Sequence, residues 1–282
     1  MSFFIKAWND FFFSRFDPMA IAIFRIFLGI AILLMLLAGF SSWEDIYSKE
    51  IVSSERWSIF VKYFWWLGFV FSITFILGLF TKFSTIVLYF LFHSMINSNP
   101  FIAGGHDYVV RMLLLFSCFA PLNYSLSVDS FFNKRNKGLP LIWSVRLIQI
   151  SVVLVYMITF LYKLVRDSAW LSGDAVYYIL TSNTWGRFPC QELFISFNGS
   201  LLLCKIATYT VLLVEGLFPI LVWFKRTKLL VICAVTVFHI LIAIKMLHVT
   251  FFSLVMISTM WIFIPSSTIF SWFNFFRGVL KK

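Results

Sequence analysis

The sequence predicts an all-α membrane protein: a polytopic bundle of about eight transmembrane helices with no soluble domain. The chain of 282 residues is 61% hydrophobic and only 12% charged, whereas soluble chains carry about 25% charge. Apolar runs recur along the whole length, and about 20 apolar residues suffice to cross a bilayer as a helix. The alternation typical of a membrane barrel is absent from the sequence, so helices are the expected spans.

Eight stretches fit the length and flanking charge of a span. They cover residues 18–40, 59–80, 83–97, 108–122, 141–163, 201–224, 228–247 and 250–270. The segment from Trp170 to Asn183 is expected to be an interfacial or re-entrant helix. No internal repeat, low-complexity segment, flexible linker or cleavable signal peptide is evident, so residues 1–282 are expected to form a single membrane domain.

The charge pattern predicts the orientation. The net charge is +11, but the basic residues sit in short loops, which favours contact with lipid headgroups over nucleic acid. If the N-terminus is inside, most loop lysines and arginines fall on the inner side, and most acidic residues fall outside. The positive-inside rule then predicts a protein of the cytoplasmic membrane with both termini cytoplasmic.

Polar residues at membrane depth are the candidates for function, because a charge there is expensive unless it is paired. Lys163, near the outer end of the fifth span, is the most informative one. A lysine in apolar surroundings gives up its proton more readily and can act as a base, whereas a neighbouring carboxylate has the opposite effect. Alternatively, Lys163 extends outward to water and has no chemical role.

Structural roles are open for the other buried candidates as well. Arg25 could bond to carbonyls of neighbouring helices, and His239 could simply be a hydrogen-bonded core residue. Glu215, in the middle of its span, could form an ion pair with Arg25 or Arg111 instead of taking part in chemistry.

No metal site is expected, and no phosphate loop or hydrolase motif occurs in the sequence. The four cysteines, Cys118, Cys190, Cys204 and Cys233, lack the spacing of metal ligands. Buried free thiols are the favoured state, although Cys190 and Cys204 both flank the predicted outer face and could pair.

Four stretches carry a resemblance to a known family. They are DPMAIAIFRIFLGI (17–30), GGHDYVVRMLLLFSCFAPLNYSLSVD (104–129), VYMITFLYKLVRDSAWLSGDAVYYIL (155–180) and FHILIAIKMLHVTFFSLVMI (238–257). In order and spacing they resemble the HTTM (horizontally transferred transmembrane) domain, the membrane part of vitamin K-dependent γ-carboxylases. The resemblance covers about residues 17–265.

The resemblance implies a site and a cofactor. In the carboxylases, the lysine of the Lys-Leu…Trp block deprotonates vitamin K hydroquinone, and Lys163 occupies that position. A membrane quinone is the cofactor this implies. We predict Lys163, His239 and Glu215 as catalytic residues. The predicted substrate- or cofactor-binding residues are Arg25, His106, Asp107, Arg111, Tyr162, Trp170 and His248.

Two departures from the carboxylases bear on function. Their block has paired lysines, whereas Tyr162 precedes Lys163 here. Their large lumenal region, which binds substrate, has no counterpart after the last span, so substrate recognition is expected to need a partner subunit. A shared fold does not establish a shared reaction. The resemblance is therefore also compatible with a peptide modification other than carboxylation.

The leading hypothesis is a membrane protein that modifies or matures a secreted peptide at the outer face, with carboxylase-like chemistry on glutamate as one form of it. The alternative is a non-enzymatic maturation, immunity or assembly factor whose buried charges only hold its helices together. A transporter is the third hypothesis. The sequence lacks the paired broken helices and repeated halves typical of many transporters.

Overall fold

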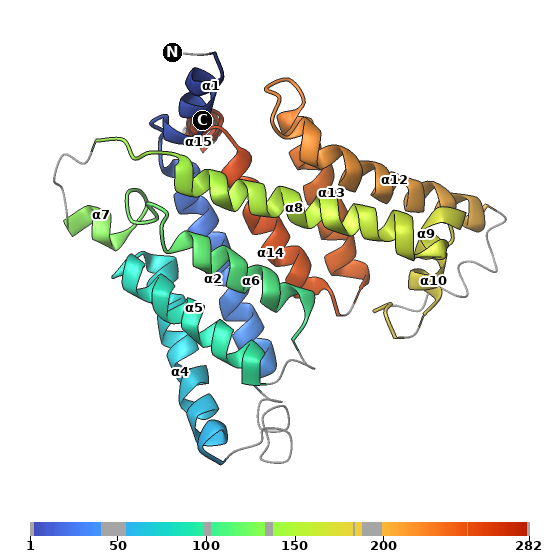
Figure 1. Cartoon of the computed structure of the whole chain (residues 1–282), viewed down its shortest axis with the longest axis horizontal. Helices are drawn as coiled ribbons and strands as arrows, with labels where there is room; N and C mark the ends of the chain where they lie inside the picture. The colour runs from blue at the N-terminus through green and yellow to red at the C-terminus, as the bar shows by residue number, and fades with distance from the viewer. Residues whose placement is uncertain are drawn as a thin grey trace. The chain divides into compact units, whose positions relative to one another are not determined.

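The computed structural model describes most of the chain, namely residues 3–40, 55–98, 103–132, 138–182, 184–187, 199–246 and 248–280. Within these ranges the chain is helical, and its extended pairing is limited to two isolated bridges, Arg15 with Leu141 and Gly186 with Met246. The predicted all-α fold class is therefore confirmed (Figure 1).

The chain divides into two compact units, which are described separately. The first comprises Met1–Gln149 and Ile264–Lys282, and the second comprises Ile150–Phe263. The first unit contains α1 (Phe3–Phe13), α2 (Met19–Gly39), α4 (Glu55–Leu77), α5 (Thr81–Ser98), α6 (Gly105–Ser117), α7 (Val128–Phe132), the start of α8 and α15 (Ser266–Leu280). The second contains the rest of α8 (Trp143–Arg166), α9 (Ser168–Ser172), α10 (Ala175–Thr181), α12 (Ser200–Leu221), α13 (Lys228–Lys245), α14 (Thr250–Met260) and the 3₁₀ helix η1 (Trp261–Phe263).

Four helices of the described part, α2, α8, α12 and α13, are long and apolar enough to cross a membrane. The count rises to five if α14 with η1 and α15, on either side of the break at Pro265, form one bent span. The other predicted stretches are helical too, in α4, α5 and α6. The total of eight spans therefore remains a prediction, while the predicted helices themselves are present.

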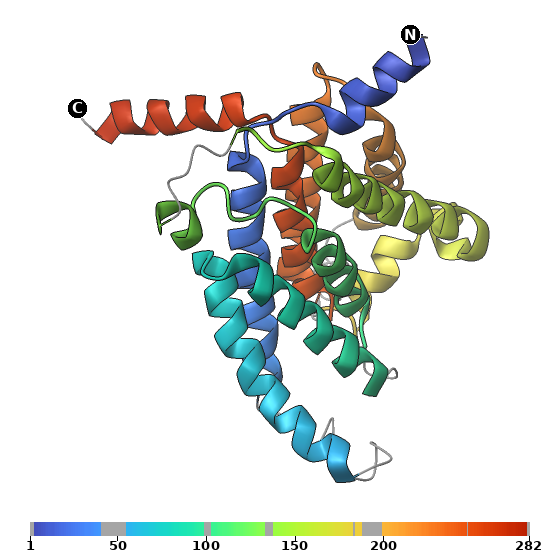
Figure 2. The same ribbon diagram turned by 60° about the vertical axis from the view of Figure 1, so that its left-hand side comes forward.

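In the first unit, α2, α4, α5 and α6 pack in succession along the chain. Figure 2 shows α4 and α5 as neighbouring helices joined by a tight turn. Gly29 permits close packing of α2 on α4, because a Cβ at this position would lie 2.6 Å from Cγ1 of Ile76. The turn between α4 and α5 contains Gly78 with φ +69°, a left-handed conformation that favours glycine.

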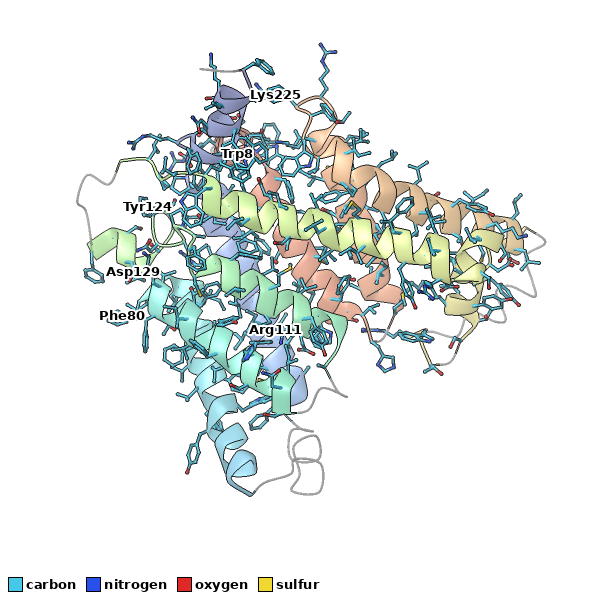
Figure 3. The ribbon with its side chains drawn as sticks, viewed as in Figure 1. Trp8, Phe80, Arg111, Tyr124, Asp129 and Lys225 are labelled. Carbon is cyan, nitrogen blue, oxygen red and sulfur yellow. The ribbon has the colours of Figure 1, made fainter. Side chains whose placement is uncertain are left out.

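Asp129, in the first turn of α7, joins that turn to α7. Its carboxylate accepts hydrogen bonds from the amides of Phe80 and Thr81 and from the Thr81 hydroxyl, at 2.7–2.9 Å. In return, the amide of Asp129 donates to the carbonyl of Gly78 at 3.0 Å. Figure 3 shows Asp129 close to Phe80. A carboxylate on the first amides of α5 also complements the positive end of that helix.

Arg25 of α2 is fully buried (0% exposed) beside the same turn. Its two terminal nitrogens donate to the carbonyls of Leu122, Ser125, Leu126 and Ile76. In the described part of the chain it forms no ion pair. Of the alternatives considered for Arg25, the described residues show bonding to carbonyls, mostly of the loop between α6 and α7, and no ion pair with Glu215.

In the second unit, α12, α13 and α14 pack in chain order, and α9 and α10 lie against α12. The region predicted as one interfacial or re-entrant helix thus contains two short helices, α9 and α10, separated by Gly173 with φ +84°. Pro219 lies inside α12. Since proline has no N–H, the helical bond to the carbonyl of Glu215 is missing.

Candidate functional site

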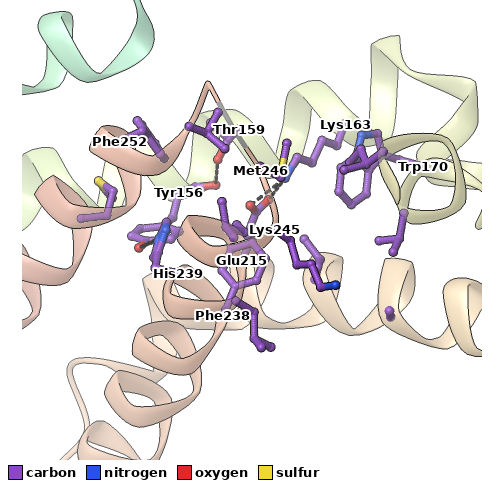
Figure 4. Close-up of a pocket in the computed structure, with 18 of the residues that line it drawn as sticks. Tyr156, Thr159, Lys163, Trp170, Glu215, Phe238, His239, Lys245, Met246 and Phe252 are labelled. Carbon is purple, nitrogen blue, oxygen red and sulfur yellow. Dashed lines mark hydrogen bonds and ion pairs between the residues drawn. The ribbon is translucent and has the colours of Figure 1, made fainter. Parts of the chain in front are cut away.

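A cavity of about 510 Å³ lies within the second unit (Figure 4). Residues of α8, α9, α10, α12, α13 and α14 line it, and most of them are apolar. Five helices, α8, α10, α12, α13 and α14, contribute residues spaced three or four apart, as one face of a helix requires, for example Ala207, Val211 and Glu215 of α12. The polar or charged lining residues are Tyr156, Thr159, Lys163, Glu215, His239 and Lys245.

Lys163 and Glu215 form an ion pair at this cavity. The Lys163 Nζ lies 2.6 and 2.7 Å from the two carboxylate oxygens of Glu215. The pair is largely shielded, with side-chain exposures of 19% for Lys163 and 7% for Glu215. The Nζ also stands 4.2 Å from the centre of the Trp170 ring, in a cation–π arrangement. Three of the predicted site residues are therefore brought together.

The close approach of α8 and α12 makes this ion pair possible. Lys163 lies in the last turn of α8, and Glu215 directly precedes Gly216 on α12. A Cβ at Gly216 would stand 2.8 Å from two ring atoms of Phe160. The lack of a side chain at Gly216 therefore lets the Phe160 ring, one helical turn before Lys163, rest on α12.

The helices α9 and α10 form the wall that carries Trp170. The carboxylate of Asp167 accepts from the amide of Ala169 and caps α9. The Tyr209 hydroxyl donates to the carbonyl of Leu171 at 3.0 Å, and the amide of Val176 donates to the Thr208 hydroxyl at 3.1 Å. These two bonds fasten the wall to α12.

A second polar group of the cavity combines Tyr156, His239 and Ser253. The Tyr156 hydroxyl lies 2.7 Å from Nε2 of His239, and Nδ1 of the same ring lies 3.4 Å from the Ser253 hydroxyl. Their exposures are 3%, 1% and 0%. The predicted residue His239 lines the cavity itself and is bonded to Tyr156, which lies on the same face of α8 as Lys163.

His248 lies at the α13–α14 turn and does not line the cavity. Its ring is 5.9 Å from that of Trp185. The neighbouring Arg187 donates from its amide to the carbonyl of Lys245 at 2.8 Å and from Nη2 to the Thr250 hydroxyl at 2.8 Å. The short segment 184–187 thus holds the turn that carries Lys245, and His248 packs in this contact.

Tyr162, predicted as a binding residue, is 63% exposed and points away from the cavity lining. The structure therefore does not place it at the site, although it is the neighbour of Lys163 in sequence. Successive residues of a helix are turned by about 100° from each other, so adjacent residues face different surroundings.

The remaining predicted residues lie in the first unit. Nε2 of His106 is 3.5 Å from the carboxylate of Asp107, which also accepts from the amide of Gly104 and closes the start of α6. Burial raises the pKa of Asp107, while His106 and that amide act in the opposite direction. The guanidinium of Arg111 stacks on the Tyr108 ring at 5.3 Å. These contacts stabilise α6 locally.

Tyr156, Thr159 and Ser253 belong to the site but were not predicted from the sequence. A signal for the first two exists, because Tyr156 and Thr159 precede Lys163 by seven and four residues and therefore share its helix face. Ser253 carries no such signal, since it depends on how α14 packs against α13.

Within the described ranges, neither a cysteine nor a metal-binding cluster belongs to the site. Cys118, Cys204 and Cys233 are free thiols, and Cys190 lies outside the described residues. In the part of the chain that the structure describes, no cluster of three or more His, Cys, Asp or Glu side chains could hold a metal ion.

The long apolar helices, two of which carry the shielded Lys163–Glu215 pair, point to an integral membrane protein. The model of the HTTM domain family matches residues 13–267, which is most of the chain and includes residues of both units. The chain therefore belongs to the HTTM domain family. Comparison with curated proteins and with solved structures yielded no match.

Proposed function

We propose that this protein is a membrane enzyme that takes a proton from a lipophilic hydroxy compound at the Lys163–Glu215 pair and uses this chemistry to modify a secreted peptide. The observation that carries the proposal is the position of the ion pair, which borders a cavity lined mostly by apolar residues. Apolar walls with a few convergent polar groups are typical of sites for small organic ligands.

The proposed first step is the transfer of a proton from Nζ of Lys163 to the Glu215 carboxylate, whose oxygens lie 2.6 and 2.7 Å away. A shift of the proton from Nζ of Lys163 to Glu215 leaves the amine with a free electron pair. That amine then accepts a proton from the hydroxyl of the ligand, which leaves an oxyanion next to the restored ammonium group.

The walls of the cavity fit a membrane quinone in its hydroquinone form, because their apolar side chains suit a ring with an apolar tail. When bound, such a cofactor would supply reducing electrons once it is ionised. The contribution of this chain would be to exclude water, hold the ring and move the proton at Lys163.

The proposed setting is the cytoplasmic membrane with both termini in the cytoplasm. It is supported by the excess of lysine and arginine in the loops assigned to the inside. This orientation brings Lys163 near the outer face, where a secreted peptide would arrive. A partner subunit is proposed to recognise the peptide.

A second candidate, a non-enzymatic assembly or maturation factor, is favoured by one specific observation. Lys163 contacts both oxygens of Glu215 and the face of Trp170. These contacts are sufficient for a purely structural role, in which the ion pair joins α8 to α12.

Mass spectrometry of the peptides released by cells tests the two candidates. Cells would carry the wild type, Lys163→Met or Lys82→Met at matched expression; Lys82 is an exposed residue of α5 and serves as control. We expect one peptide to gain mass in the wild type and the control, with a loss of about 100-fold in Lys163→Met. A gain equal to CO₂ would identify carboxylation. Equal modification, or none, in all three strains would leave the assembly factor as the better proposal.

A further inference from the structure

The hydrogen bonds of Tyr156, His239 and Ser253 have a direction that follows from counting donors and acceptors. All three side chains are buried, so each polar hydrogen needs an acceptor within the protein or from a ligand. The distances of 2.7 Å and 3.4 Å connect them in a single chain from α8 through α13 to α14.

The His239 ring is neutral in this arrangement. Both of its nitrogens face hydroxyl groups, and both oxygens of Glu215 are bonded to Lys163. A buried charge without a partner is costly. One ring nitrogen therefore carries a hydrogen and the other accepts one.

Ser253 decides which nitrogen carries the hydrogen. Among the described residues, the hydroxyl of Ser253 has one hydrogen-bond partner, Nδ1 of His239. Its hydrogen is satisfied only if Nδ1 accepts it. The ring hydrogen then sits on Nε2 and is donated to the oxygen of Tyr156.

This direction leaves the hydrogen of the Tyr156 hydroxyl without an acceptor in the described part of the protein. Among the described residues, that hydroxyl bonds to His239 alone, and in this bond the phenolic oxygen is the acceptor. Tyr156 lines the cavity, two turns along α8 from Lys163. Its hydroxyl hydrogen is available to a molecule that occupies the cavity.

We propose that Tyr156 is the hydrogen-bond donor of this cavity, oriented by His239 and Ser253, and that the ligand is an apolar molecule with an oxygen acceptor such as a carbonyl. The apolar walls hold the body of the ligand, and Tyr156 fixes the position of its oxygen. The inference rests on the cavity being the ligand site of the proposed function, but it does not depend on base chemistry at Lys163.

Nitrogen NMR tests the direction without any ligand. The full chain, labelled with ¹⁵N-histidine in lipid nanodiscs, has only four histidines, and the variant His239→Asn assigns the signal. We expect hydrogen on Nε2 and a bare Nδ1 in the wild type. Hydrogen on Nδ1 would overturn the proposal, because Tyr156 would then donate to the ring.

Two variants of α14 sharpen this test. Ser253→Ala removes the donor to Nδ1, so we expect the ring hydrogen to redistribute towards Nδ1. Ser258→Ala is the matched control, since that buried hydroxyl bonds to the carbonyl of Val255 in the same helix. An unchanged His239 signal in Ser253→Ala would contradict the assigned role of Ser253.

Binding of two probes tests the ligand class. The probes are 2-decyl-1,4-benzoquinone, which carries carbonyl oxygens, and decylbenzene, which carries none. One hydrogen bond contributes about 1 kcal/mol, or about fivefold in affinity. We expect Tyr156→Phe and Ser253→Ala to weaken quinone binding about fivefold and to leave decylbenzene unchanged. Equal quinone binding by these variants and the wild type, or no quinone binding by the wild type, would overturn the proposal.

The outcome is separable from that of the proposed function. If Lys163→Met leaves released peptides unchanged while Tyr156→Phe weakens quinone binding, the cavity binds a ligand without the proposed base chemistry. If Lys163→Met abolishes modification while His239 carries its hydrogen on Nδ1, the base proposal stands and the role of Tyr156 falls.

Discussion

Arg25 and Lys163 are both cations in apolar surroundings, but they are stabilised in different ways. Arg25 is fully buried, and backbone carbonyls of four residues accept its hydrogen bonds. Lys163 is bound by a side chain, Glu215, and borders a cavity. Backbone carbonyls move only with the fold, whereas a carboxylate can rotate or take up a proton.

The difference shows how burial alone fails to identify a functional charge. Arg25 is the more buried of the two, yet its partners belong to the loop before α7 and to the end of α4, where it holds the backbone in place. The partner of Lys163 is titratable, and the pair faces space for a ligand. Chemistry is expected where the partner of the buried charge can change its state.

The largest expected effect is that of Arg25→Met. Several buried carbonyls would lose their donor, at about 1–3 kcal/mol each, so the first unit should lose about 4 kcal/mol or more. The measurement is the temperature at which Cys118, a free thiol of this unit, becomes reactive in detergent micelles. Arg111→Met is the control and should cost about 1 kcal/mol, because Arg111 stacks on a single ring. Equal effects of the two variants would mean that Arg25 is not a structural link.

The Lys163–Glu215 pair should behave differently, because both charges can be removed together. Lys163→Met and Glu215→Met each leave one shielded charge alone and should each cost about 3 kcal/mol, the low end of the range for breaking a buried ion pair, because Lys163 is still 19% exposed. The double variant should return close to wild-type stability. Reactivity of the buried thiol of Cys204 reports the unfolding of this unit. Additive losses in the double variant would show that the two charges are not coupled.

A smaller effect is expected at the contact that brings the pair together. In Gly216→Ala the new methyl group would meet the Phe160 ring at 2.8 Å, which should cost about 1–2 kcal/mol and lengthen the ion pair. Adding Phe160→Leu should restore much of the loss. Gly278→Ala, with no heavy atom within 4 Å of the new methyl group, is the matched control. If both alanine variants melt at the same temperature, the contact between Gly216 and Phe160 does not limit the stability of the protein.

Much of the fold was predictable because transmembrane stretches are recognised by composition. The eight apolar stretches are mainly helical, and Lys163, Glu215, His239 and Trp170 all line the one cavity described above. Each was predicted from the cost of a polar group among apolar neighbours, or from its place in a family block. Such a cost can be judged from one residue and its flanking sequence.

The unpredicted part depends on how helices are turned and paired. Tyr162 was chosen for its position next to Lys163, but helical rotation places Tyr156 in the cavity instead. His106, Asp107 and Arg111 form local contacts within α6 and its start. Ser253 could not be predicted from the sequence. A serine in an apolar helix does not stand out as a functional residue until its hydrogen-bond partner is known.

Pro219 lowers the resistance of α12 to bending at the candidate site. The missing bond falls on the carbonyl of Glu215, so the helix is least reinforced at the residue that carries the buried carboxylate. Gly216, the next residue, offers little steric resistance to bending. Because one helical hydrogen bond is missing there, α12 resists bending least beside the cavity, and a change in the curvature of this one helix is the expected way for the cavity to admit a ligand.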